Sequence, residues 1–99
     1  MTTVGDYLRE KVGNMAVWLK ENGCIVDMPS MSNVAVTSFA QKLRDECRDA
    51  INTRNFQALL ADKDALPPQV LMIVSFVQRN SELHDKFWRY LALFSDTVE

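Results

Sequence analysis

Residues 65–78 read ALPPQVLMIVSFVQ and contain no charged side chain. Between positions 70 and 77 every residue except Ser75 is apolar, so neither a helix nor a strand would have a polar face there. A segment that is apolar on every side is expected to be buried on every side. It is also well short of the ~20 apolar residues that span a bilayer. The rest of the chain, or a partner, therefore has to enclose it.

The composition of the whole chain is that of a globular protein. Its 99 residues are 47% hydrophobic and 24% charged, with a net charge of -2, and we expect residues 1–99 to form a single helical domain. So small a net charge gives no general attraction to polyanions. Two cysteines are too few for a disulfide scaffold, and we find no signal peptide or transmembrane segment. These features predict a cytoplasmic protein in a reducing compartment, without membrane attachment.

An amphipathic helix is predicted near the start of the chain. Thr3 and Asp6 have the spacing of a capping box, in which each side chain accepts a hydrogen bond from the other residue's backbone. Gly23 ends the helix, because glycine adopts the left-handed conformation without steric cost. Gly13 lies inside the pattern and indicates a kink or a close helix contact. Apolar residues recur at helical spacing: Tyr7, Leu8, Val12, Met15, Trp18 and Leu19.

A second helix, at residues 36–51, has the clearest amphipathic pattern in the chain. Ser30 or Ser32 is expected to cap it, and Asn52 with Thr53 is expected to end it. A short helix follows at 56–60. The apolar stripe of the second helix consists of Val36, Phe39, Ala40, Leu43, Cys47, Ala50 and Ile51.

The uncharged segment and the residues after it are predicted to form the last two helices. Pro67 and Pro68 begin the first of these, because proline suits the first turn of a helix. Ser81 is expected to cap the second, whose buried stripe includes Phe87, Leu91 and Phe94. We therefore predict an all-α fold, a compact bundle of about five helices around a central, fully apolar helix at about residues 68–79.

Few residues suggest catalysis. His84 is the one histidine, and it lies at the start of the last helix, where a cation is not favoured. Cys47 falls on an apolar stripe and is interpreted as a core residue, whereas Cys24 follows the helix-ending glycine and could be exposed. The chain has no phosphate-binding loop, metal-binding spacing or paired-carboxylate motif. We therefore predict no enzymatic activity, no cofactor and no metal ion; an activity of Cys24 with His84 is a distant alternative.

Protein–protein interaction is the class of function that the sequence favours. The last helix has more aromatic surface than one buried stripe requires, and tryptophan and tyrosine are enriched at binding hot spots. The connection at 24–32 is unusually apolar, and methionine-rich surfaces adapt to partners. Both groups could instead seal the ends of the bundle. We predict an adaptor, inhibitor or assembly subunit that binds a protein partner or itself. Its predicted contact residues are Trp88, Tyr90, Ile25, Val26, Met28 and Met31.

Binding of RNA or DNA is the alternative. Phosphate contacts need a net basic face, and the basic residues of the second and last helices are interleaved with acidic ones such as Asp45, Glu46 and Asp85. A nucleic-acid partner is therefore less favoured than a protein. The residues that would carry this alternative are Arg44, Arg48, Arg54, Arg79 and Arg89.

Overall fold

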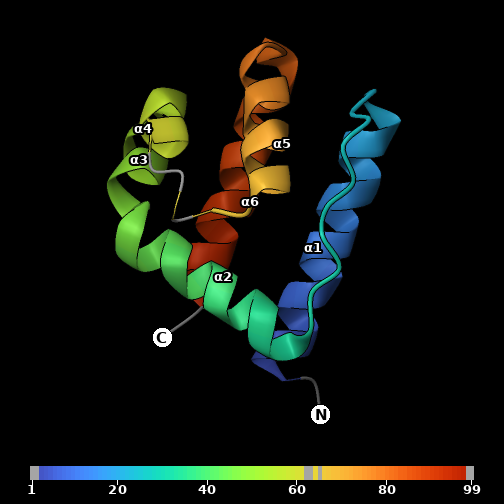
Figure 1. The fold of residues 1–99 in the computed structure, drawn as a ribbon, viewed down its shortest axis with the longest axis vertical. Helices are drawn as coiled ribbons and strands as arrows, with labels where there is room; N and C mark the ends of the chain where they lie inside the picture. The colour runs from blue at the N-terminus through green and yellow to red at the C-terminus, as the bar shows by residue number, and fades with distance from the viewer. Residues whose placement is uncertain (1–2, 62–63, 65, 98–99) are drawn as a thin grey trace.

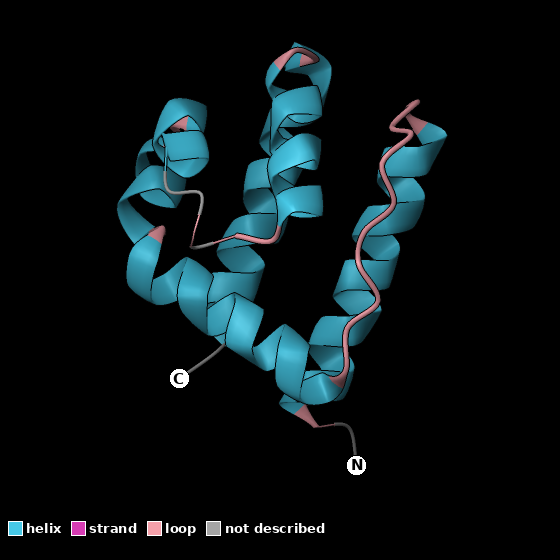
Figure 2. Ribbon diagram, viewed as in Figure 1, coloured by secondary structure: helices cyan, strands magenta, loops and turns pink. Residues whose placement is uncertain are grey.

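A computed structural model describes residues 3–61, 64 and 66–97. These residues form six α-helices and one short 3₁₀ helix, and they contain no strand (Figures 1 and 2). The predicted all-α bundle is therefore confirmed. The elements are α1 (Val4–Glu21), α2 (Asn33–Glu46), α3 (Arg48–Thr53), α4 (Phe56–Ala61), α5 (Pro68–Gln78), η1 (Ser81–Leu83) and α6 (His84–Thr97).

The ends of α1 are those predicted from the sequence. The Asp6 backbone N–H donates to Thr3 Oγ1 at 3.1 Å, and the Thr3 N–H donates to Asp6 Oδ2 at 3.5 Å, which completes the capping box. Gly23 follows the helix with a φ of 89°. That is the left-handed region, which glycine enters at least cost. The chain then runs back beside α1 as an extended connection to α2 (Figure 1).

The helix predicted at 36–51 is two helices. Ser32 caps α2, since its Oγ accepts from the Ala35 N–H at 3.1 Å, but the regular helix is interrupted at Cys47, where φ is -115° and ψ is 9°. The chain continues as α3, and its Ala50 and Ile51 are still buried. The apolar stripe is thus correct, and the chain bends within it.

The last two predicted helices begin differently from each other. Pro68 occupies the first turn of α5, as predicted. Ser81 was expected to cap the final helix, and this is wrong, because Ser81 lies inside η1. Asn80 precedes it, and its side-chain amide donates to the Phe76 carbonyl at 2.7 Å. This bond ties the turn to the end of α5.

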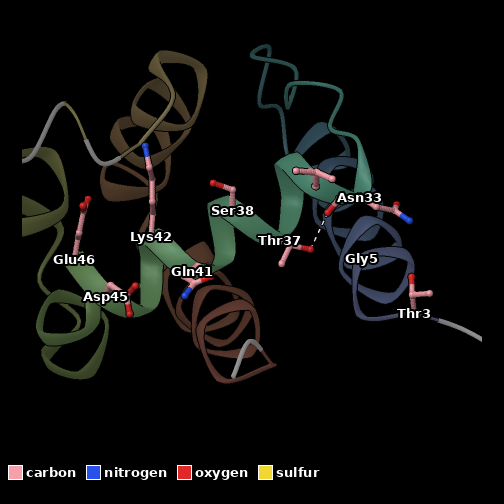
Figure 3. Close-up of a pocket in the computed structure, with 10 residues that line it drawn as sticks. Thr3, Gly5, Asn33, Thr37, Ser38, Gln41, Lys42, Asp45 and Glu46 are labelled. Atoms are coloured by element: carbon pink, nitrogen blue, oxygen red, sulfur yellow. Dashed lines mark hydrogen bonds between the residues drawn. The ribbon is translucent and has the colours of Figure 1, made fainter.

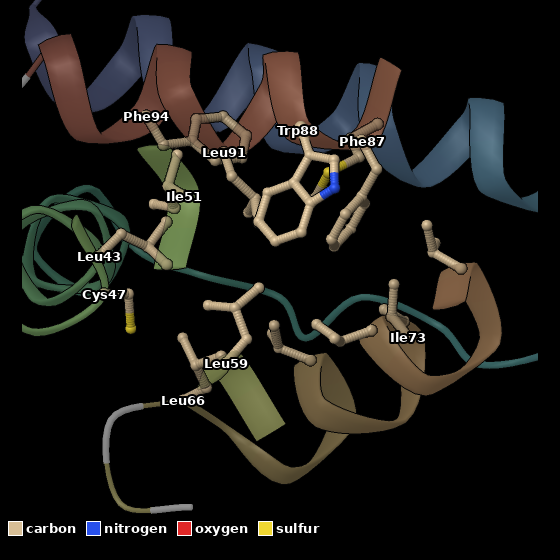
Figure 4. Close-up of a cluster of buried hydrophobic side chains, with 14 of the residues drawn as sticks. Leu43, Cys47, Ile51, Leu59, Leu66, Ile73, Phe87, Trp88, Leu91 and Phe94 are labelled. Carbon is tan, nitrogen blue, oxygen red and sulfur yellow. The ribbon is translucent and has the colours of Figure 1, made fainter. Parts of the chain in front are cut away.

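α6 is the element that holds the bundle together. Among the described residues, α1 to α5 contact one another only in sequence order, whereas the backbone of α6 lies close to those of α1, α2, α3, α5 and η1. Figure 4 shows Phe87 and Trp88 of α6 directed toward Leu59 and Ile73. The apolar helix α5 packs against α4, η1 and α6. It therefore lies at one side of the bundle, not at the centre as predicted.

The position of α5 leaves part of it uncovered. Its buried residues, Val70, Ile73, Val74 and Val77, recur at three- and four-residue spacing and face the bundle. Met72 lies on the other side of the helix and is 57% exposed. The prediction that this segment is buried on every side is therefore wrong, because its helical neighbours cover one face only.

The junction of α1 and α2 is unusually close. Gly5 is buried, and a Cβ atom placed on it would lie 2.7 Å from the Cβ of Asn33. The Asn33 amide donates to Asp6 Oδ1 at 2.8 Å, while Asn33 Oδ1 accepts from Arg9 Nη1 at 3.2 Å. The close contact expected at Gly13 is therefore found at Gly5, since no atom lies within 4 Å of a Cβ placed on Gly13.

These hydrogen bonds make the stability of the junction depend on pH. The bond from Asn33 holds the pKa of the Asp6 carboxyl below its ordinary value of 3.8, and the bonds from Thr3 add to the shift. Because the folded-state pKa is the lower one, this stabilisation is present above the unfolded pKa and is lost as pH falls through the folded pKa. We expect the free energy of unfolding, measured by denaturant titration at a series of pH values, to fall less steeply at acid pH in Asp6→Asn than in the wild type. Asp96→Asn, at an exposed site on α6, is the control; equal slopes at acid pH for Asp6→Asn and wild type would contradict the prediction.

Candidate protein-interaction surface

An apolar surface lies where the segment after α1 approaches the uncovered side of α5. It contains a hollow of about 410 Å³ between residues 23–26 and the second half of α5. A second hollow, of about 310 Å³, adjoins it at Met72 and Ser75 and extends toward Leu60 of α4. We define the α5 surface by six residues: Ile25, Val26, Leu71, Met72, Ser75 and Phe76.

Ile25 is 95% exposed, and the chain around it explains why. The Cys24 N–H donates to the Leu19 carbonyl at 2.9 Å, which folds the chain back over the end of α1. Cys24 is buried and Val26 packs against the core. Since both neighbours face inward, the side chain between them faces solvent.

The α5 side of the surface follows from helical geometry. Positions facing away from the buried stripe of a helix are ordinarily polar, yet α5 has Met72 there, with Leu71 and Phe76 at the two borders of the stripe. Leu71 and Phe76 are half-buried, and Met72 is exposed. Arg79, the residue directly after α5, is the one charged side chain that the structure places along these two hollows. The surface is therefore apolar with a cation at its edge.

The predicted contact residues separate into three groups. Ile25 and Val26 belong to the α5 surface. Met28 and Met31 are half-buried and line a smaller hollow, of about 240 Å³, against Val12 of α1. The structure thus divides the apolar connection at 24–32, and only its first part faces α5.

The aromatic residues of α6 make up the third group. Trp88 is 3% exposed, with its ring centroid 4.5 Å from that of Phe56, so its prediction as a contact residue is wrong and it belongs to the core (Figure 4). Tyr90 is half-buried, and its ring lies 5.8 Å from that of Trp18 on α1. The Lys86 ammonium lies 5.2 Å from the Trp18 ring centroid. Tyr90 therefore closes the seam between α1 and α6 and does not line the α5 surface.

Sequence reasoning missed the α5 part of the surface: Leu71, Met72, Ser75 and Phe76. All four lie in the segment expected to be enclosed on all sides. The signal that could have found them is helical spacing: a helix with neighbours on one side buries every third or fourth residue, and α5 buries Val70, Ile73 and Val77. Apolar residues of α5 that lie between these buried positions are therefore not needed to fill the core.

The arginines proposed for nucleic acid do not form one basic face. Arg54 Nη1 and Arg89 Nη2 both bind the carboxylate of Asp85, at 3.1 Å and 2.9 Å. Arg79 lies at the edge of the α5 surface. Arg44 is half-buried near the end of α2, and Arg48 is exposed at the start of α3.

The residues considered for catalysis lie in separate environments. Cys24 is buried, with its Sγ 3.6 Å from the Val26 carbonyl oxygen, so the expectation that it could be exposed is wrong. His84 Nε2 lies 3.1 Å from the Gln78 carbonyl oxygen, and its ring packs 4.6 Å from that of Phe56. Cys47 is buried, as predicted, and is not joined to Cys24 by a disulfide.

Two further searches cover the part of the chain that the structure describes. In residues 3–61, 64 and 66–97, no three His, Cys, Asp or Glu side chains are grouped so that they could hold a metal ion. Within the same ranges, no helix has the length and apolar character needed to cross a membrane.

Another hollow, of about 590 Å³, runs along one side of α2. It is lined mostly by polar side chains, among them Ser38, Lys42 and Asp45. Figure 3 shows these side chains spaced along the helix, with Ser38 and Lys42 on the same side of it, and they do not meet at a common point. The Thr37 hydroxyl is used locally, since it donates to the Asn33 carbonyl at 2.7 Å. This hollow therefore lacks the convergent polar groups of a small-molecule site.

Comparison with protein-family models, with curated proteins and with solved structures finds no match to this chain. Its class is thus given by the fold, an all-α bundle closed by α6. Its functional assignment depends on the α5 surface.

Proposed function

We propose that this chain is a non-enzymatic interaction module that binds a protein partner or itself through the α5 surface. One observation carries the proposal: Ile25 and Met72, which come from segments far apart in sequence, are both exposed and line the same apolar hollow. Burying a fully exposed side chain of this size contributes about 1.5–3 kcal/mol. Exposed apolar patches of this kind mark interaction sites in soluble proteins.

The composition of α5 supports the same conclusion. A helix that only had to cover the side of a bundle would be stable with polar residues at its outer positions. From Pro68 to Gln78 this helix has no charged residue. Met72 is exposed on its outer side, and the half-buried Leu71 and Phe76 flank it. An apolar centre with polar groups at the rim is typical of protein interfaces, and Arg79 occupies the rim here.

Nucleic-acid binding receives less support. Asp85 offsets the positive charge of Arg54 and Arg89, and phosphate binding requires a face with net positive charge. The hollows of the α5 surface contain one cation, Arg79. Their chemistry fits an apolar side chain better than a phosphate.

Site-specific photo-crosslinking in cells of the native source tests the proposal. We expect a photoreactive amino acid at position 72 to form protein adducts that gel electrophoresis and mass spectrometry detect. Val34 is the matched control, because it is an exposed apolar residue, 80% accessible, on α2 and outside the α5 surface. Equal adduct patterns at the two positions, or no adduct at position 72, would contradict the proposal.

A further inference from the structure

We propose that the partner of the α5 surface is a second copy of this chain, in a two-fold symmetric dimer. This inference rests on the proposed function, because it identifies the partner that occupies the same surface. Three properties of the surface lead to it: its shape, its charge and its size.

The shape is self-complementary. Ile25 projects almost fully into solvent, and the hollow of about 410 Å³ beside it is lined by Val26, Met72 and Phe76. In a two-fold contact both subunits use the same patch, so a projection on one copy meets the depression on the other, and the reverse. A projecting apolar side chain next to an apolar hollow satisfies this condition. Ser75, a small residue between Met72 and Phe76, leaves room for the incoming side chain.

The distribution of charge permits self-association. A two-fold axis places residues near it against their own copies, and like charges in such contact cost several kcal/mol. α5 has no charge over its whole length, so no like-charge pair can form along it. If two α5 helices pair antiparallel near Met72 and Ser75, Arg79 of one copy approaches the start of the other copy's α5. The residues exposed at that start, Pro68 and Gln69, are uncharged, so Arg79 would meet no like charge there.

The size of the surface predicts a weak dimer. α5 has eleven residues and is about 16 Å long at 1.5 Å per residue. The whole described surface is 5950 Å², and a standard interface uses about a tenth of the surface of a small protein. A contact made by one short helix with Ile25 and Val26 belongs to the small interfaces, which are typical of transient complexes. We therefore expect the monomer and the dimer to exchange at micromolar concentrations.

Sedimentation equilibrium across a concentration series tests the dimer. We expect the weight-average mass of the wild type to rise from the monomer value of 11.3 kDa toward twice that value. Met72→Glu is expected to stay at the monomer mass, and Val34→Glu, the matched control, to follow the wild type. Because Met72 is more than half exposed, its substitution leaves the core intact, and unchanged thermal melting checks this.

A charge-pairing experiment identifies the symmetry. Met72→Glu and Met72→Lys are each expected to be monomeric, whereas an equal mixture is expected to form dimers, because the two copies of residue 72 lie near the axis with opposite charges. Wild type that remains monomeric at all concentrations would overturn the dimer; adducts of position 72 with a different protein would then still support the proposed function. Wild-type dimers that persist in Met72→Glu, or a mixture that stays monomeric, would overturn α5 as the dimer contact.

Discussion

Trp88→Ala is expected to lower the free energy of unfolding by about 3–5 kcal/mol, the range for deleting a large aromatic side chain from a core. The indole is 3% exposed and packs 4.5 Å from the ring of Phe56 and 6.2 Å from that of Phe87. It therefore joins α6 to α4, and its removal leaves a cavity between them. For a domain whose total stability is roughly 5–15 kcal/mol, a loss of this size reaches a large share of the total.

Denaturant titration followed by far-UV circular dichroism measures this effect, since it does not depend on tryptophan emission. Tyr90→Ala is the control on the same helix, because Tyr90 is half-buried and should cost much less. Trp88→Phe keeps most of the apolar volume and is expected to be intermediate between wild type and Trp88→Ala. A cost below about 1 kcal/mol, the size typical of surface changes, would contradict the burial of Trp88 and restore it as a contact residue.

Gly5→Ala is expected to destabilise the fold by about 1–3 kcal/mol, the usual cost of overpacking a tight contact. The added methyl group would lie 2.7 Å from the Cβ and 3.2 Å from the Cα of Asn33. The second of these atoms belongs to the backbone, so α1 and α2 must separate to accept it. Such a movement also strains the hydrogen bond between Asn33 and Asp6.

Gly13→Ala provides the matched control for this substitution. It replaces a glycine in the same helix, but no atom lies within 4 Å of the added methyl group. Alanine is the better helix former by about 1 kcal/mol, so this variant is expected to be more stable than the wild type. Opposite shifts of the denaturation midpoint for Gly5→Ala and Gly13→Ala would confirm that the close contact is at Gly5. A Gly5→Ala protein as stable as the wild type would contradict it.

Local signals in the sequence predicted most helix ends correctly. The Thr3 capping box, the Ser32 cap and the turn at Gly23 depend on hydrogen bonds or dihedral angles within a few residues, and the structure contains all three. The break at Cys47 has no such signal, because neither glycine nor proline lies there. The break was missed because the apolar stripe continues through Cys47 into α3. The bend depends on the packing of α2 and α3 against the rest of the bundle, which a local pattern does not show.

The two largest errors have one physical cause. Trp88 was expected at the surface and is buried, whereas Met72 was expected in the core and is exposed. A periodic pattern shows which face of a helix is apolar, but it does not show how many neighbours that helix has. α6 has neighbours on several sides and buries a wide arc, and α5 lies at the side of the bundle. Two of the six residues of the α5 surface, Ile25 and Val26, were therefore predictable, whereas the four from α5 required the packing.

The place of α6 in the chain also affects how the protein is made. α1 to α5 contact one another only in sequence order within the described residues, and α6, the last helix of these, is the element that joins them. Roughly sixty residues separate α1 from α6. The contact that closes the bundle therefore joins distant segments of the chain, and contacts of this kind form slowly. As the ribosome adds residues, the earlier helices therefore emerge with their apolar faces uncovered. The bundle can close only after α6 has been made, and until then the apolar surface that α6 covers in the folded protein stays exposed to aggregation.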